Sequence, residues 1–311
     1  MAARLRSMLQ QRGPGPLSRL SLRQRRYVVA WTFLAPILLY YLVFALYPIA
    51  LAVVMSVSDW KLNNPVRPFI GLQNYVKLAS DTDFRLALAN TVEYTVMYVP
   101  GVFVVSLIGA MALNSIRHGR ALYRAIYFAP VMTAGIVVAL IWKYMLHPSY
   151  GLANVVLNSV GIPSQPWLVQ AKTAMASLVM IAVWESMGYQ MVLFLAGLQG
   201  IPLHLYDSAK IDGANIWQRF VHITWPLLRP TVTFVLVVTV IGAFQMFTLA
   251  YAFGYYGGPG DSLLVAVMYI RHQMLTLGNV GYAASMALVL FAIISIVTII
   301  QLRMTRTRWR Y

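Results

Sequence analysis

The sequence of 311 residues contains no cysteine and only eight acidic residues, against 24 lysines and arginines. Without cysteine the chain can form no disulfide and no thiolate metal site. Charged residues make up only 10% of the chain, whereas a soluble domain typically has about 25%. This shortage of charge, together with 60% hydrophobic residues and a mean hydropathy of +0.68, predicts an all-α, polytopic membrane protein.

The sequence also lacks the common catalytic motifs. It has no Gly-x-x-x-x-Gly-Lys-Ser/Thr phosphate loop, no His-x-x-x-His pair and no nucleophile elbow. His147 is a lone histidine near a predicted membrane boundary, with no second ligand at a helical spacing. We therefore expect no catalytic residue, no metal site, no cofactor and no ATP hydrolysis in this chain.

The net charge of +16 is concentrated beside predicted membrane spans. Residues 1–27 carry seven arginines before the first apolar run, and residues 303–311 carry four after the last. This is the positive-inside pattern, so both terminal segments are predicted to be cytoplasmic, and nucleic acid is not expected as a partner. The apolar run that follows residue 27 is too long for a signal peptide and is interpreted as a retained first span.

Six spans are predicted within a membrane domain of residues 28–302. They cover approximately residues 28–57, 90–113, a third segment that ends near 146, 173–199, 227–252 and 282–302. Pro36 and Pro48 predict a kink or a break in the first span, and Pro130 lies inside the third. Asn90 is expected to cap the helix of the second span.

Residues 201–230 form the longest polar interruption between apolar segments in the second half of the chain. Pro202 can start a short helix, and Gly213 permits a sharp turn after it. Asn215 and Gln218 have the spacing of a capping box for a second short helix. Its apolar residues share one face: Trp217, Phe220 and Val221. A helix this short is unstable alone, so that face is expected to need a partner surface.

This stretch resembles the cytoplasmic signature loop of permease subunits of binding-protein-dependent ABC importers. That signature runs Glu-Ala-Ala, three residues, Gly, nine residues, Ile, one residue and Leu-Pro. The matching positions are Asp207, Ser208, Ala209, Gly213, Ile223, Trp225 and Pro226. Three of them depart from the pattern, since Asp207 replaces Glu, Ser208 replaces Ala and Trp225 replaces Leu. The triplet Asp212, Gly213 and Ala214 is similar to the sugar-importing branch, which includes maltose and glycerol-phosphate permeases.

The resemblance extends over about residues 28–302. Further similar phrases occur at residues 69–75, 90–91, 127–130, 142, 151–154 and 257–260. It implies a type I importer permease fold in the inner or plasma membrane of a bacterium or archaeon. The partners it implies are a second homologous permease, an extracytoplasmic solute-binding protein and two cytosolic ATPase subunits, which would bind the ATP and Mg²⁺.

The resemblance also implies two sets of functional residues. The chain would form half of the path for a sugar or oligosaccharide and contact the ATPases through residues 201–226. The coupling residues implied are Asp207, Ser208, Ala209, Asp212, Gly213, Ala214, Trp217, Phe220, Ile223 and Pro226.

One acidic residue, Glu185, lies in the middle of the fourth predicted span. An ionised carboxylate there costs roughly 2.5 kcal/mol or more, so it should face the helix bundle, a cavity or a partner. Glu185 is expected to line the substrate path, to form an interhelical hydrogen bond or to pair with the partner subunit. Gly188 is expected to permit close packing or a local break. Aromatic rings beside carboxylate or amide groups suit sugars, although such rings also serve packing. The candidate path residues are Trp184, Glu185, Tyr189, Gln190, Phe244 and Gln245.

Three alternatives remain open at this point. A permease for glycerol-phosphate esters would have the same architecture. An independent secondary transporter would not need the signature loop, and a membrane enzyme would need a cluster of acid, base or metal-binding groups. The sequence names neither the sugar nor the partner subunits, and it leaves open which of the two permeases holds the substrate.

Overall fold

The computed structural model describes residues 21–116 and 119–305. These residues form helices and loops, and their one β-type contact is an isolated bridge between Ser58 and Phe69. The chain divides into two compact units, Met1–Met55 and Ser56–Tyr311. The all-α class predicted from the sequence is confirmed.

In its described residues, the first unit consists of one long apolar helix, which ends at Ser56, the first residue of the second unit. Its parts are α2 (Leu22–Tyr41), the π-helix η2 (Leu42–Leu46) and α3 (Tyr47–Ser56). Ser21 and Gln24 cap its start with a reciprocal capping box, so the helix begins before the predicted span. The helix passes Pro36 without a break, and the π-helical turn precedes Pro48, which has no N–H to donate to the preceding turn. All residues of α2 are exposed.

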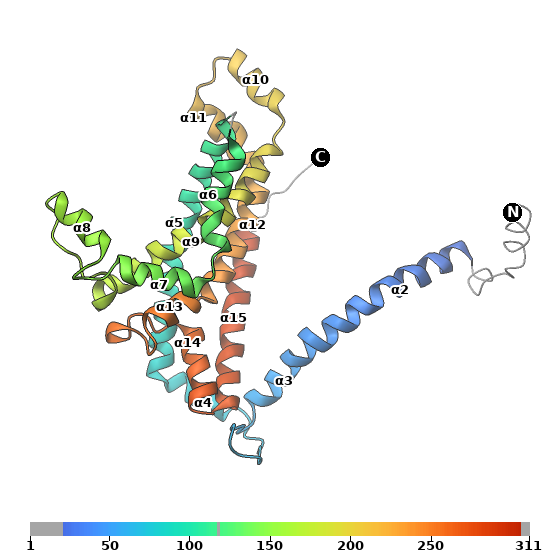
Figure 1. Ribbon diagram of the computed structural model, residues 1–311. Helices are drawn as coiled ribbons and strands as arrows, with labels where there is room; N and C mark the ends of the chain where they lie inside the picture. Colours follow the sequence, from blue (N-terminus) through green and yellow to red (C-terminus); the bar gives the residue numbers. More distant parts are fainter. Residues whose placement is uncertain (1–20, 117–118, 306–311) are drawn as a thin grey trace, which may run out of the picture. The chain divides into compact units, whose positions relative to one another are not determined.

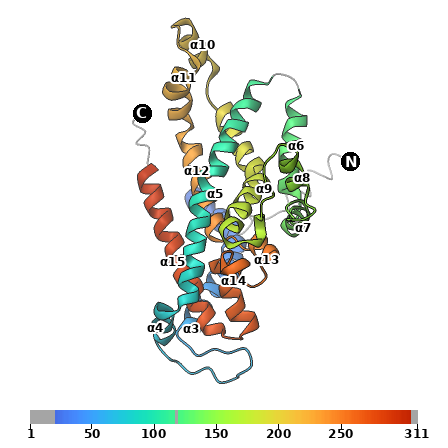
Figure 2. The same cartoon turned by 90° about the vertical axis from the view of Figure 1, so that its left-hand side faces the viewer.

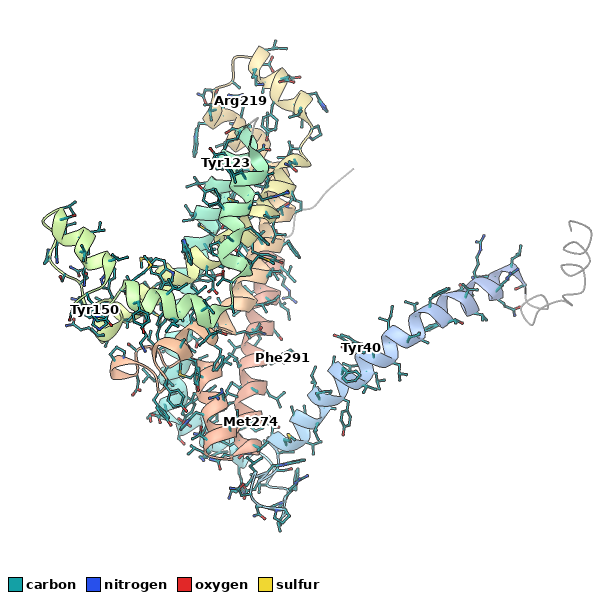
Figure 3. The ribbon with its side chains drawn as sticks, viewed as in Figure 1. Tyr40, Tyr123, Tyr150, Arg219, Met274 and Phe291 are labelled. Carbon is teal, nitrogen blue, oxygen red and sulfur yellow. The ribbon has the colours of Figure 1, made fainter. Side chains whose placement is uncertain are left out.

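The second unit holds the remaining spans and several short helices. They are α4 (Gln73–Ser80), α5 (Thr82–Ser115), α6 (Arg120–Met132), α7 (Gly135–Met145), α8 (Leu152–Ser159), η3 (Trp167–Val169), α9 (Ala171–Gln199), α10 (Leu203–Ile211), α11 (Ile216–Arg219), η4 (Phe220–Thr224), α12 (Trp225–Phe244), α13 (Thr248–Phe253), η5 (Pro259–Asp261), α14 (Ala266–Arg271), η6 (His272–Thr276) and α15 (Val280–Thr305). In this unit α10 and α11 lie at one end of the long helices, and α4 and α14 lie at the other (Figures 1 and 2). Figure 3 places Arg219 at the α10–α11 end and Met274 at the α4–α14 end.

In the described residues, five helical segments are long and apolar enough to cross a membrane. They are Leu22–Ser56, Thr82–Ser115, Ala171–Gln199, Ile216–Phe253 and Val280–Thr305. A sixth crossing exists when the pair Ala121–Met132 and Gly135–Met145, bent by 95°, counts as one span. The six predicted spans are therefore present, but the third is a bent pair.

Two spans are interrupted, the third near its middle and the fifth close to its end. The third changes direction at Thr133 and Ala134, which have extended backbone angles between α6 and α7. The fifth was predicted to run through residues 227–252, but it leaves helical geometry at residues 245–247, between α12 and α13. The segments that follow the two breaks, α7 and α13, pack against each other. Irregular backbone at membrane depth is tolerated when it is buried in protein in this way.

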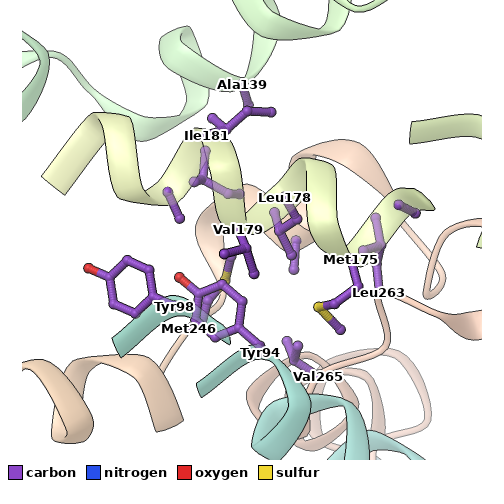
Figure 4. Packing of buried hydrophobic residues seen from close by; sticks show 14 of the residues in the cluster. Tyr94, Tyr98, Ala139, Met175, Leu178, Val179, Ile181, Met246, Leu263 and Val265 are labelled. Atoms are coloured by element: carbon purple, nitrogen blue, oxygen red, sulfur yellow. The ribbon is translucent and has the colours of Figure 1, made fainter. Parts of the chain in front are cut away.

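The core lies around α5 and α9, which share the most extensive packing of any helix pair in the fold. One cluster of buried residues joins α5, α7, α9, α13 and the loop before α14 (Figure 4). Tyr94, Leu178 and Ile181 belong to it. A second cluster lies nearer α10 and α11, and joins α5, α9 and α12 through residues such as Phe194 and Leu228. The two clusters meet on α9 in the region of Glu185.

Close helix contact at Gly188 brings α6 and α9 together. A β-carbon added to Gly188 would lie 2.1 Å from the backbone oxygen of Tyr127. Since α9 continues unbroken through this position, the packing role predicted for Gly188 is confirmed and a local break is excluded.

Asn90 does not cap the second span, so that prediction is wrong. Asp81 caps α5 instead, and its Oδ1 accepts the N–H of Phe84 at 2.9 Å. Asn90 lies inside the helix and its Nδ2 donates to the carbonyl oxygens of Asp261 and Leu264, at 2.8 and 3.0 Å. The side chain therefore holds the loop between α13 and α14, which is distant in sequence, against α5.

Asp81 also joins three helices at the α4–α14 end. Its carboxylate accepts hydrogen bonds from Tyr282 of α15 at 2.5 Å and from Tyr269 of α14 at 3.1 Å. Partial burial acts to raise the pKa of Asp81, but the hydrogen bonds from Tyr282, the Phe84 N–H and Tyr269 outweigh it and lower that pKa. Burial and the neighbouring carboxylate raise the pKa of Tyr269 to about 12. The carboxylate thus remains charged and the phenol remains a donor near neutral pH.

The close contact at Gly188 predicts that one added methyl group strongly lowers the stability of the protein. Gly188→Ala should destabilise the protein by about 1–3 kcal/mol, because the backbone of α6 must move to admit the methyl group. Thermal unfolding of the purified protein measures this change. Gly242→Ala is the matched control, since Gly242 also lies inside a spanning helix but has no atom within 4 Å of the added carbon. Equal unfolding midpoints for the two variants would contradict the prediction.

Candidate functional site

The turn between α10 and α11 has the local structure that its sequence predicts. Gly213 has φ of +77°, a conformation that a residue with a side chain rarely adopts. Its N–H donates to Lys210 O at 3.1 Å, and the Ala214 N–H donates to Ala209 O at 2.8 Å. These two bonds satisfy carbonyl groups at the end of α10 in the manner of a Schellman cap. The turn is therefore fixed by backbone bonds.

The predicted capping box of α11 is confirmed. Asn215 Oδ1 accepts the Gln218 N–H and Gln218 Oε1 accepts the Asn215 N–H, each at 2.8 Å. The second short helix is not separate, however, because α11 continues through the π-helical turn η4 into α12. Pro226 has no N–H for an ordinary helical bond, and the Trp225 N–H reaches back to Phe220 O. This turn is thus joined to the fifth span as one helical segment.

The structure brings most of the predicted coupling residues together at this end of the molecule. Ala209, Asp212, Gly213, Ala214 and Ile223 line one groove of about 410 Å³. Asp207 and Phe220 line a neighbouring groove. Ser208 lies on α10, Trp217 on α11 and Pro226 in the first turn of α12.

The surface formed by α10 and α11 exposes large apolar side chains. Ile211 is 87% exposed, Ile216 76% and Trp217 70%. Trp217 stacks on Phe220 with ring centroids 5.6 Å apart, and Tyr206 is tied to Thr224 by a hydrogen bond of 2.9 Å. A rigid turn that presents several apolar groups to solvent has the character of a protein-docking surface.

Glu185 lies where the two interrupted spans meet. A β-carbon on Gly135, the first residue of α7, would lie 3.2 Å from Glu185 Oε1 and 3.2 Å from Thr248 Cγ2, at the start of α13. Glu185 is half-buried, and within the described part of the chain its carboxylate forms no hydrogen bond or ion pair. A half-buried carboxylate without a partner is costly, so it marks a candidate ligand site.

The other predicted path residues are spread around this point. Trp184 and Tyr189 are partly exposed, and Trp184 packs edge-on against Trp142 at 5.4 Å. Gln245 is exposed at the break of the fifth span. Gln190 is buried, and its Oε1 accepts no hydrogen bond from the described residues. Phe244 does not join them, because it is only 5% exposed and packs in a separate cluster with α15.

Sequence reasoning missed several residues around Glu185. The Tyr98 hydroxyl on α5 lies 2.7 Å from Ser186 Oγ, which in turn donates to Ala182 O. Gly135 and Thr248 approach Glu185 only because both spans break there. Ser186 adjoins Glu185 in the sequence, and this position could have identified it as a residue of the site. The break at residues 245–247 contains neither proline nor glycine, so nothing in the sequence pointed to it.

Comparison with known proteins assigns this chain to a protein family. Residues 94–310 match the family described as "Binding-protein-dependent transport system inner membrane component". The chain belongs to this family. It is therefore the membrane component of a transport system, and not itself an enzyme.

The permease is similar to relatives that align with most of its length and to another protein whose solved structure has the same fold. It is 36% identical to the arabinooligosaccharides transport system permease protein AraP of Bacillus subtilis, over 88% of each chain. It is 31% identical to the trehalose/maltose transport system permease protein MalF of Thermococcus litoralis, over 92% of this chain and 97% of that protein. A chain in the crystal structure of a bacterial alginate ABC transporter, in complex with alginate pentasaccharide-bound periplasmic protein, superposes with a TM-score of 0.77. That match has 22% identity and covers 93% of this chain and 97% of the other, and it supports the type I importer permease fold.

The unpaired carboxylate of Glu185 predicts a gain in stability on its removal. Glu185→Gln should raise the unfolding midpoint of the purified transporter complex by about 2–4 °C, because a costly half-buried charge is lost. Thermal unfolding at constant pH measures the change. Glu93→Gln, which neutralises an exposed carboxylate on the neighbouring α5, should leave the midpoint unchanged. A lower midpoint for Glu185→Gln would show that the carboxylate is paired across a subunit interface.

Proposed function

We propose that this permease is one membrane-spanning subunit of an ATP-driven ABC importer and forms half of the translocation path for a sugar or oligosaccharide. The observation that carries the proposal is the pair of sugar-transporting relatives, AraP and MalF, which align along nearly the whole chain. The unpaired Glu185 supports it, and so does Trp184, which precedes Glu185 in the sequence and packs edge-on against Trp142. Sugars offer hydroxyl donors to a carboxylate and apolar ring faces to aromatic side chains.

The partners follow from the proposed system. An extracytoplasmic binding protein would deliver the sugar, a role supported by the binding-protein-dependent family and by the periplasmic protein bound to the alginate transporter. The long apolar helix of the first unit, whose α2 residues are all exposed, would contact lipid and a second homologous permease. Two cytosolic ATPase subunits, which would hold the ATP and Mg²⁺, would bind the α10–α11 surface. In this proposal that surface and both chain ends lie in the cytoplasm, with residues 1–27 and 303–311 as basic tails.

The α10–α11 turn is suited to pass ATPase movement to the membrane domain. Its backbone is held by the Gly213 and Ala214 bonds, and α11 is continuous with α12 through η4. A push on the turn would therefore tilt the fifth span. Because that span is interrupted beside Glu185, the parts before and after the interruption can move differently and expose a site there to each side of the membrane in turn.

The alternatives are less well supported. A glycerol-phosphate ester would bring a negatively charged phosphate toward the unpaired Glu185 carboxylate, and like charges at short range repel. A secondary transporter would have no use for an apolar docking surface at the α10–α11 turn. A sugar importer driven by separate ATPases accounts for both features.

Glu185→Gln is expected to lower sugar uptake about tenfold or more, because a hydrogen bond to a charged group is worth about 1.5–3 kcal/mol. Uptake of radiolabelled maltose and arabinotriose by cells that carry the variant measures this effect. Glu93→Gln should transport at the wild-type rate. Wild-type uptake by Glu185→Gln would place the sugar elsewhere, for instance in the partner permease.

Gly213→Pro is expected to abolish uptake, because proline cannot adopt φ of +77° and cannot donate the bond to Lys210 O. The permease would be purified from its native membrane together with its partners. The wild type should bring an ATPase, and Gly213→Pro should lose either that ATPase or its coupling to transport.

Gly161→Pro is the matched control for this variant. Gly161 has φ of +80°, no neighbouring atom within 4 Å and an N–H bond of 3.1 Å to Asn158 O, which is almost the same geometry. It lies in the loop after α8, away from the α10–α11 turn, so its variant should retain uptake. Normal transport by a well-expressed Gly213→Pro protein would refute the coupling role of the turn.

A further inference from the structure

A chain of aromatic rings leads away from the break in the fifth span toward the α4–α14 end. Phe247 stacks on Tyr251 with ring centroids 5.1 Å apart, and Tyr251 contacts Tyr255 at 5.2 Å. Tyr255 contacts Tyr256 at 4.6 Å, and Tyr256 meets the imidazole of His272 at 5.6 Å. Five rings in consecutive contact thus begin two residues beyond Gln245.

Charged groups accompany these rings. The Arg271 guanidinium lies over the Tyr251 ring at 4.7 Å and over the Phe247 ring at 5.9 Å. Tyr251, Tyr255, Tyr256 and Arg271 line one cavity of about 160 Å³, and the carboxyl-bearing residues Asp83 and Asp261 line it too. Aromatic faces combined with donors and acceptors from Arg and Asp match the mixed surface of a sugar, which has apolar ring faces and a rim of hydroxyls.

The exposed rings are not required by the fold. Tyr255 is 60% exposed and Tyr256 62%, so they add little to the hydrophobic core. The loop that carries them is nevertheless held firmly, because Asn90 donates to Asp261 O and Leu264 O, and the Leu263 N–H donates to Gly257 O at 2.7 Å. Exposed tyrosines on an anchored loop are presented in a fixed arrangement, which favours binding.

We propose that this aromatic cavity is a carbohydrate subsite on the extracytoplasmic side, where sugar rings stack on Tyr255 and Tyr256 before they reach the break beside Glu185. The proposal rests on the proposed function and adds a second contact zone to it. The lining residues Met268, Tyr269 and Arg271 belong to α14. The ribbon places α14 at the end opposite α10 and α11, which is the side from which an importer would receive its substrate (Figures 1 and 2). Tyrosines at a membrane boundary also serve as interfacial anchors, and the experiment separates the two roles.

The test uses the complete importer in proteoliposomes, with its binding protein loaded with radiolabelled maltose or arabinotriose. The double variant Tyr255→Leu/Tyr256→Leu should lower the initial uptake rate about 3- to 10-fold, because two stacking surfaces are lost. The double variant Tyr255→Phe/Tyr256→Phe keeps the rings and should remain within about twofold of the wild type. Capture of the loaded binding protein by the importer should be unchanged in both variants.

Tyr150→Leu is the matched control. Tyr150 is 59% exposed and stacks on His147 with ring centroids 3.6 Å apart, but it does not line the cavity. It should transport at the wild-type rate.

Three results would overturn the subsite. They are wild-type uptake by the Leu pair, equal losses in the Leu and Phe pairs, and a loss of binding-protein capture that matches the loss of uptake. The last result would make the cavity a protein-docking surface. If the wild-type complex shows neither sugar uptake nor ATP hydrolysis stimulated by the binding protein, the proposed function is wrong, and the proposal of a subsite is then wrong as well.

Discussion

Every backbone N–H and C=O group inside a bilayer needs a hydrogen-bond partner within the protein, and this fold depends on that requirement. Two spans break their helical hydrogen bonding, after Met132 and after Phe244, and both breaks need protein around them. The fold meets this need by packing α7 against α13 and by placing both beside α9. Irregular backbone, with Glu185 beside it, is thereby confined to one place inside the unit Ser56–Tyr311.

Close approach of the helices makes this arrangement possible. Gly188 leaves no room for a side chain between α9 and the backbone of α6, and Gly197 performs the same task between α9 and α12, where an added carbon would lie 2.4 Å from Thr231 Oγ1. In lipid, helices gain little from hydrophobic burial against one another, so packing of small residues and hydrogen bonds such as that of Tyr98 with Ser186 must supply the contact. A rigid bundle with one irregular region is the result.

The continuity of α11, η4 and α12 links the two ends of the unit. A surface-exposed turn and a membrane span form one helical segment, which is interrupted only beside Glu185. Beyond that interruption, α13 carries Tyr251, and the aromatic contacts continue to a loop anchored by Asn90. The proposed coupling surface, the interruption beside Glu185 and the proposed carbohydrate subsite therefore follow one another along one stretch of sequence. In the proposed import cycle, sugar meets them in the reverse order.

The sequence by itself determined the fold class, the number and approximate positions of the spans, and the Gly213 turn with its Asn215 capping box, because these depend on hydropathy over about 20 residues and on local backbone preference. Glu185 also stood out, since a charge within an apolar run is visible without a structure. Only the tertiary structure decided the break at residues 245–247, the anchoring role of Asn90, the burial of Phe244 and the line of rings from Phe247 to His272. Each of these depends on contacts between residues far apart in the chain, and hydropathy and spacing carry no information about such contacts.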